Sequence, residues 1–85
     1  MQVAVDISLY PLDADFIPPI KDVIARLNSH DGLDITTNAM STQVFGEYAD
    51  VMRALTTEIG TTFDAVPKAV FTIRILNNPV TSNRQ

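Results

Sequence analysis

One short stretch of the sequence concentrates side chains that can form hydrogen bonds without carrying a charge. It consists of Thr37, Asn38, Ala39, Met40, Ser41 and Thr42. Hydroxyl and amide groups both donate and accept hydrogen bonds, whereas the thioether of methionine is soft and largely apolar. This stretch is the first candidate for a functional site, and its value depends on what the fold places beside it.

The groups on which most catalytic and metal sites depend are scarce. The sequence holds no cysteine, which excludes disulfides, thiolate nucleophiles and cysteine-based metal sites. Its one histidine, His30, falls beside Asp31 in the turn after a helical pattern, where a solvated or capping role is the ordinary interpretation. Asp13 and Asp15 have no further ligands around them to hold a metal, and no glycine-rich loop feeds a helix to hold a phosphate. We therefore expect no enzymatic activity, no cofactor and no metal.

Hydrophobic periodicity predicts the elements that position this stretch. Apolar and polar residues alternate from residue 3 to residue 10, which is typical of a half-buried strand, and Pro11 ends it. Apolar residues at helical spacing follow from Ile20 to Leu27, with Pro18 and Pro19 in the first turn. Two short strands, at about 33–38 and 41–45, then form a hairpin.

The second half of the chain repeats the order of a helix and a strand. Gly46 and Glu47 break the strand pattern before a second helix. The apolar face of this helix carries Val51, Met52, Leu55 and Ile59. Gly60 and two threonines loosen the end of the helix, residues 64–67 form a turn, and the last strand covers residues 69–76.

This order, β-α-β-β-α-β, limits the possible topologies. Two helices bury their apolar stripes best when both cover one face of the sheet. With right-handed crossovers, the result is an α+β ferredoxin-like fold whose antiparallel four-stranded sheet has the order 4-1-3-2. We expect one domain over residues 1–78 and a flexible C-terminal tail over residues 79–85.

In this topology the end of the first strand, the hairpin and the start of the last strand meet at one end of the sheet. The candidate ligand-binding residues that meet there are Ser8, Tyr10, Thr37, Asn38, Met40, Ser41, Thr42 and Phe71. A shift of one residue in register exchanges the two faces of a strand, so the pattern predicts the group and not the individual contacts. Many of these side chains are expected on the face that the helices leave open.

That open face has an unusual composition. It is expected to carry Ala4, Asp6, Ser8, Tyr10, Thr72 and Arg74. Antiparallel pairing sets Asp6 opposite Arg74 as a cross-strand ion pair. The face is either a polar surface turned to water or an interface between sheets that contains a pocket, and small polar residues suit both.

Charge and hydropathy exclude some partners. The net charge is −4 and the six Lys and Arg residues are scattered, so no basic surface is expected to bind nucleic acid. No apolar run approaches the roughly 20 residues that a membrane span requires. The first residues lack the basic and apolar regions of a signal peptide, which favours a cytoplasmic protein.

Three segments, residues 8–12, 16–20 and 37–48, resemble the YkoF-like family of thiamine- and hydroxymethylpyrimidine-binding proteins. The resemblance spans about residues 3–77, and its most specific part is Met40, Ser41 and Thr42 inside the hairpin with Gly46 after it. It implies a ferredoxin-like fold, ligand binding in place of catalysis, and homo-oligomers, dimers or tetramers, that form through sheet faces or edges.

The ligand that the resemblance implies matches the chemistry of the candidate residues. An aminopyrimidine offers an amino donor and ring-nitrogen acceptors, which a few fixed hydroxyls or amides and an apolar wall can recognise. Ser8, Thr37, Asn38, Ser41 and Thr42 supply the polar groups. Tyr10, Met40 and Phe71 supply the wall. Without a phosphate-binding loop, thiamine or its pyrimidine half fits better than the pyrophosphate.

Two other functions remain open. The first is a structural or regulatory oligomerisation domain that uses the same open face and binds no small molecule. The second is a small enzyme, which rests on analogy of fold alone and is disfavoured by the missing cysteine and the position of His30.

Overall fold

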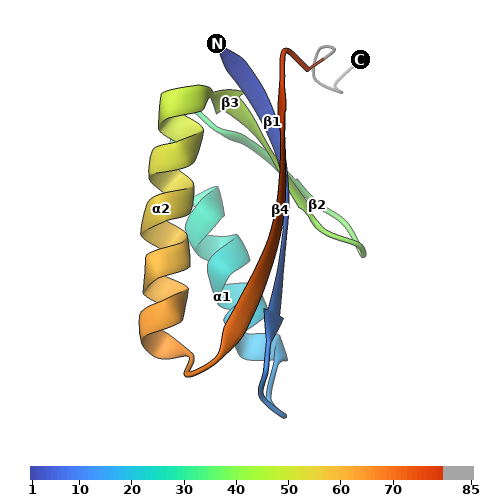
Figure 1. Ribbon diagram of the computed structural model, residues 1–85, viewed down its shortest axis with the longest axis vertical. Coiled ribbons are helices and arrows are strands. Elements are labelled where there is room, and N and C mark those ends of the chain that lie inside the picture. Colours follow the sequence, from blue (N-terminus) through green and yellow to red (C-terminus); the bar gives the residue numbers. More distant parts are fainter. Residues whose placement is uncertain (80–85) are drawn as a thin grey trace.

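The structure is a computed structural model that describes residues 1–79. Its elements are β1 (Gln2–Pro11), α1 (Ile17–Asn28), β2 (Asp34–Thr37), β3 (Thr42–Glu47), α2 (Tyr48–Ala65) and β4 (Ala69–Asn77). The strands form one antiparallel sheet in the order β2-β3-β1-β4. Both helices cover the same face of this sheet (Figure 1). The predicted ferredoxin-like arrangement is confirmed, and most of the predicted tail, residues 80–85, lies outside the described residues.

Alternation in β1 builds the core. Its buried side chains, which face the helices, are Val3, Val5, Ile7 and Leu9. They pack against Val44 of β3, Leu27 of α1, and Val51 and Leu55 of α2. Pro18 and Pro19 lie in the first turn of α1, as predicted. Prolines are tolerated there because the first N–H groups of a helix have no partner within it.

The prediction that Gly46 and Glu47 break the third strand was wrong. Strand β3 continues through both residues, and α2 begins directly after them at Tyr48. A Cβ atom at Gly46 would lie 2.9 Å from Leu33 Cδ2 and 3.3 Å from Val51 Cγ2. The glycine therefore marks a close approach between β3 and its neighbours, which a strand tolerates.

The predicted end of the second helix was also wrong. Gly60 and the following threonines do not loosen α2, which continues to Ala65, and the turn occupies residues 66–68. Thr62 is buried and its Oγ1 accepts a hydrogen bond from Arg26 Nη2 at 2.8 Å. Thr61 Oγ1 donates to the Thr57 carbonyl within the helix at 3.0 Å. Both hydroxyls have partners in the helical conformation, and the low helix propensity of Gly60, Thr61 and Thr62 does not end the helix.

A buried carboxylate ties the two helices together. Glu58 of α2 is only 7% exposed, and Arg26 Nη1 of α1 lies 3.3 Å from its Oε1. His30 caps α1 through its backbone N–H, which donates to the Leu27 carbonyl at 3.2 Å. In addition, its ring Nε2 lies 2.7 Å from Glu58 Oε2, so His30 has a packing role that the sequence pattern did not indicate.

Among residues 1–79, neither α1 nor α2 combines the length and the apolar character that crossing a bilayer requires.

Candidate functional site

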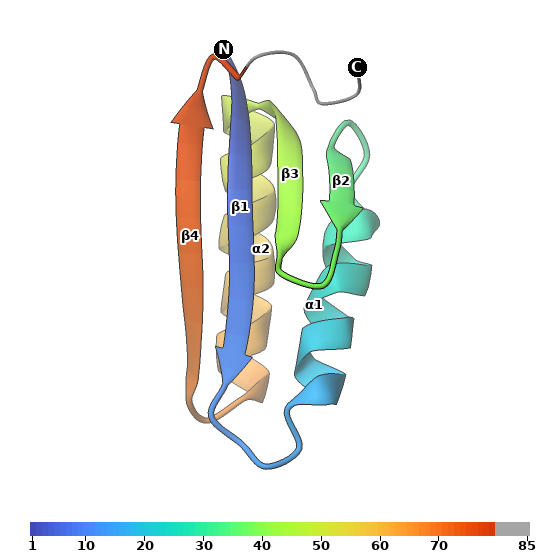
Figure 2. The same cartoon turned by 90° about the vertical axis from the view of Figure 1, so that its right-hand side faces the viewer.

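The site begins with a mismatch in strand length. Strand β1 pairs with β4 from Val3 to Pro11, but it pairs with β3 only from Gln2 to Ile7, which lies opposite Thr42. Beyond Ile7 the hairpin between β2 and β3 turns away, before the end of β1 (Figure 2). Residues 8–11 of β1 therefore have a neighbouring strand on one side only.

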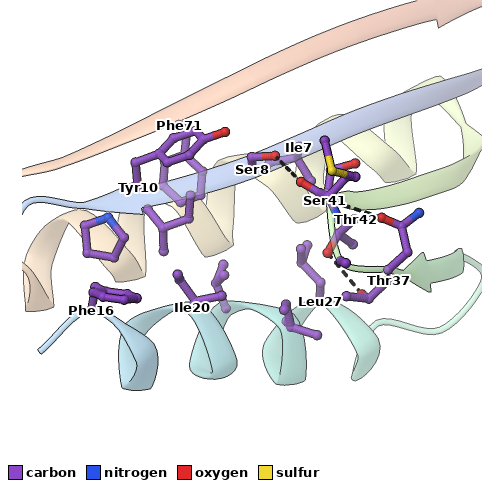
Figure 3. A pocket seen from close by; sticks show the side chains of 17 residues that line it. Ile7, Ser8, Tyr10, Phe16, Ile20, Leu27, Thr37, Ser41, Thr42 and Phe71 are labelled. Atoms are coloured by element: carbon purple, nitrogen blue, oxygen red, sulfur yellow. Dashed lines mark hydrogen bonds between the residues drawn. The ribbon is translucent and has the colours of Figure 1, made fainter.

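A cavity of about 390 Å³ occupies the space that β3 leaves. It lies between the end of β1, helix α1 and the hairpin, with Ser8 and Tyr10 along one side and Phe16, Ile20 and Leu27 along the other (Figure 3). Its volume is within the range of about 300–1,000 Å³ that small-molecule sites occupy. All eight residues predicted from the sequence line this one cavity.

The hairpin at the end of the cavity is held by Asn38. Its side-chain oxygen accepts hydrogen bonds from the backbone N–H groups of Met40 at 2.8 Å and Ser41 at 3.1 Å. Its own backbone N–H donates to the Ser41 carbonyl at 3.0 Å. An asparagine that binds the backbone two residues further on is typical of a tight turn. The Asn38 oxygen is thus engaged in shaping the site.

The remaining polar side chains divide between the two faces of the sheet. Thr42 is 5% exposed, and its Oγ1 lies 3.0 Å from Thr37 Oγ1, which places a hydroxyl pair at the hairpin end of the cavity (Figure 3). Ser8 Oγ donates to the Met40 carbonyl at 3.5 Å and links β1 to the hairpin. Ser41 lies next to them, but its hydroxyl donates to Asp6 on the open face.

The predicted pairing of Asp6 with Arg74 is confirmed. Arg74 donates to Asp6 Oδ2 from Nε at 3.1 Å and from Nη2 at 2.5 Å, and Gln43 Nε2 lies 3.3 Å from Oδ1. The Ser41 hydroxyl, and after it the Arg74 guanidinium, hold the pKa of the Asp6 carboxyl below its ordinary value. Asp6 is a charged but well-paired group outside the cavity.

The aromatic and thioether side chains differ in their exposure and in their contacts with other side chains. The ring of Phe71 packs edge-on against Phe63 of α2 with centroids 5.6 Å apart. Tyr10 is half exposed at the mouth of the cavity. Met40 is 85% exposed, so its side chain lies mostly in solvent while its carbonyl accepts from Ser8.

Sequence reasoning missed the helical wall of the cavity. The lining residues that were not predicted are Ile7, Leu9, Pro11, Phe16, Ile20, Val23, Ile24, Leu27 and Ala39. The apolar stripe of α1 was read as core alone, and the cluster was expected mainly on the open face. The difference in length between the first and third predicted strands was the signal that could have placed the cavity at the uncovered end of β1.

The fold and the cavity define a ferredoxin-like domain with a site of small-molecule size at one end of its sheet. The sequence model of the family described as thiamine-binding protein matches residues 5–84, and the chain belongs to this family. Among curated proteins, none matches the chain.

Solved structures share the fold. A hypothetical protein from Methanocaldococcus jannaschii is 25% identical, with a TM-score of 0.80 over 96% of this chain and 86% of that one. A protein from Streptococcus pneumoniae is 21% identical, with a TM-score of 0.88 over 98% and 93%. A protein from Thermotoga maritima, with a suggested role in thiamine biosynthesis or salvage, is 22% identical, with a TM-score of 0.70 over 89% and 83%.

Proposed function

We propose that the chain binds thiamine or its hydroxymethylpyrimidine moiety in the cavity between β1, α1 and the hairpin, and that it does so without catalysing a reaction. The observation that carries this proposal is the combination of a hydroxyl pair at one end of the cavity with apolar walls along its length. Membership of the thiamine-binding family supports the same class of ligand.

The lining chemistry favours an unphosphorylated heterocycle over a phosphorylated ligand. Among the described residues, the lining contains neither Lys nor Arg, the side chains that most often neutralise phosphate groups. Phe16, Ile20 and Phe71 offer apolar surface to a flat ring, while Thr37 and Thr42 offer hydroxyls to its nitrogen atoms. Free thiamine or its pyrimidine half therefore fits this proposal better than thiamine pyrophosphate.

We further propose that the protein acts as a homo-oligomer, a dimer or tetramer joined through sheet edges or faces. Strand β4 lies at the edge of the sheet over nine residues and has exposed apolar side chains on both of its faces. They are Val70, Ile73, Ile75 and Leu76. A long apolar edge strand of this kind is a natural surface for pairing with a second copy.

Calorimetric titration with thiamine and with hydroxymethylpyrimidine tests the ligand. We expect saturable binding and a rise in Tm, and Thr37→Val should weaken binding about tenfold because a polar group of the ligand loses its partner. Thr36→Val is the matched control, since it removes a hydroxyl from the opposite face of the same strand. If millimolar ligand produces no binding heat and no thermal shift, the proposal is contradicted.

A second candidate function is assembly without a small ligand, which the exposed apolar side chains of β4 favour. Ile75→Lys should disrupt oligomers measured by light scattering, whereas Thr56→Lys, on the exposed surface of α2, should not. If wild-type protein assembles but binds neither thiamine nor hydroxymethylpyrimidine, the assembly function replaces the ligand-binding one.

A further inference from the structure

The hydrogen bonds of β1 show which of its backbone groups face which neighbour. In an antiparallel sheet the N–H and C=O of one residue point to the same side, and successive residues alternate. The Leu12 N–H donates to the Lys68 carbonyl at 3.0 Å, so even-numbered residues face β4. The Tyr48 N–H donates to the Met1 carbonyl at 2.9 Å, so odd-numbered residues face β3.

Leu9 is the residue at which this pattern loses its partner. Its N–H and C=O face the β3 side, but β3 pairs with β1 only as far as Ile7. The same register would set Met40 opposite Leu9, and the hairpin turn held by Asn38 carries residue 40 away. Within residues 1–79, no hydrogen bond engages the backbone of Leu9, although the residue is only 7% exposed and lines the cavity.

A buried N–H and C=O without partners destabilise a fold unless something else binds them. A ring nitrogen beside an exocyclic amino group presents one acceptor and one donor side by side. A strand residue in a hydrogen-bonded pair presents the same two groups through its own C=O and N–H. An aminopyrimidine can therefore take the place of a missing strand residue.

We propose that the backbone of Leu9 reads the amino edge of the ligand. Its N–H donates to the ring nitrogen and its C=O accepts from the neighbouring amino group, so that the heterocycle occupies the hydrogen-bonding position of residue 40. This inference rests on the proposed function of the cavity and deepens it, because it makes the main chain the group that selects aminopyrimidines.

The geometry favours a single ring over a peptide strand. The next residue of β1 that faces the same side is Pro11, which has no N–H to donate. An added peptide strand needs a row of donors and acceptors along an edge, whereas this edge offers one complete pair. Helix α1 also borders the cavity along its length (Figure 3).

The selection has a direct consequence for specificity. In the 4-oxo analogue of hydroxymethylpyrimidine, the ring nitrogen carries a proton and the exocyclic group is an acceptor. Donor then meets donor and acceptor meets acceptor at Leu9. A site built for hydrogen bonds strongly rejects a ligand that leaves them unpaired, so we expect the 4-oxo compound to bind about 100-fold more weakly or not at all.

Amide hydrogen exchange measured by NMR, combined with calorimetry, tests the inference on the unmodified protein. Saturating hydroxymethylpyrimidine should slow exchange of the Leu9 amide at least about tenfold, as expected when an open amide becomes bonded. The Ile73 amide is the matched control, since it faces the free edge of β4 and should not respond.

The outcomes separate the inference from the proposed function. If hydroxymethylpyrimidine binds but the Leu9 amide does not change, or if the 4-oxo analogue binds equally well, the Leu9 inference is overturned and the ligand-binding function stands. If neither compound binds, the proposed function fails and the inference fails with it.

Discussion

Strand β1 has two segments with the same alternating sequence and different surroundings. Its paired segment, residues 2–7, has β3 on one side and β4 on the other, and the sheet there lies so close to its neighbours that a methyl group at Gly46 would have to displace Leu33. Its open segment, residues 8–11, has only β4 beside it and borders a cavity of about 390 Å³. The contrast teaches that a shortened neighbouring strand is enough to leave a cavity where the core would otherwise continue.

The two segments of β1 contribute differently to the structure. The paired segment supplies close packing, which holds β1 rigid and in register. The open segment continues the same rigid strand and is paired with β4, so its side chains and backbone groups stay in place without a strand on the β3 side. Sites supported by rigid elements keep their geometry better than sites on loops.

The largest expected effect comes from opening a void beside the paired segment. Val44 is fully buried opposite Val5, and Val44→Ala should lower the free energy of unfolding by roughly 2 kcal/mol through lost burial and the void left behind. Urea denaturation measures this loss. Val70→Ala removes the same atoms from a half-exposed position of β4 and should change stability by less than about 0.5 kcal/mol.

Adding atoms should distinguish the two segments most directly. Gly46→Ala should cost about 1–2 kcal/mol, because the new methyl group collides with Leu33 and Val51. Ile20→Phe adds more atoms beside the open segment and should cost less than about 1 kcal/mol, since the cavity accepts them.

The same pair of variants should separate stability from binding. Calorimetry should show ligand affinity reduced about tenfold or more in Ile20→Phe, which fills the cavity, and little changed in Gly46→Ala. A large loss of stability in Ile20→Phe with unchanged binding would mean that the cavity is not the site.

The smallest expected effect concerns Asp6, the charged group near the end of the paired segment on the open face. The lowered pKa of Asp6 means that its contribution to stability is present above its ordinary pKa of about 4 and is lost as the pH falls through the lower folded value. Ser41→Ala should reduce this acid-side loss, by less than about 1 kcal/mol because the Asp6 carboxylate is itself partly exposed to solvent. Denaturation curves between pH 6 and about pH 2 measure it; a slope unchanged in Ser41→Ala would contradict it.

Much of the fold was predictable because it depends on local patterns. Alternation over residues 3–10 predicted β1, and the spacing from Ile20 to Leu27 predicted α1. The order of elements then led to the sheet order, and the register that follows from it placed Asp6 opposite Arg74. The eight candidate residues gathered around one cavity for the same reason.

The errors share one physical cause, which is that a neighbour in space overrode a local preference. Gly46 was read as a break because glycine weakens a strand, but here Leu33 and Val51 approach so closely that a Cβ atom would require them to shift. Gly60 was read as the end of a helix, but Arg26 of the other helix binds Thr62 and α2 continues. Neither neighbour can be identified from the residues next to the glycine.

The sequence by itself determined which residues alternate, which form helices and which end of the sheet collects hydroxyl groups, because these properties follow from side-chain periodicity and connection order. Only the tertiary structure decided that β3 begins no earlier than Thr42, that α1 forms the second wall, and that the N–H and C=O of Leu9 face a side on which no strand pairs with them. Those features depend on how the lengths of separate strands match once they are paired, and pairing is a contact between distant parts of the chain.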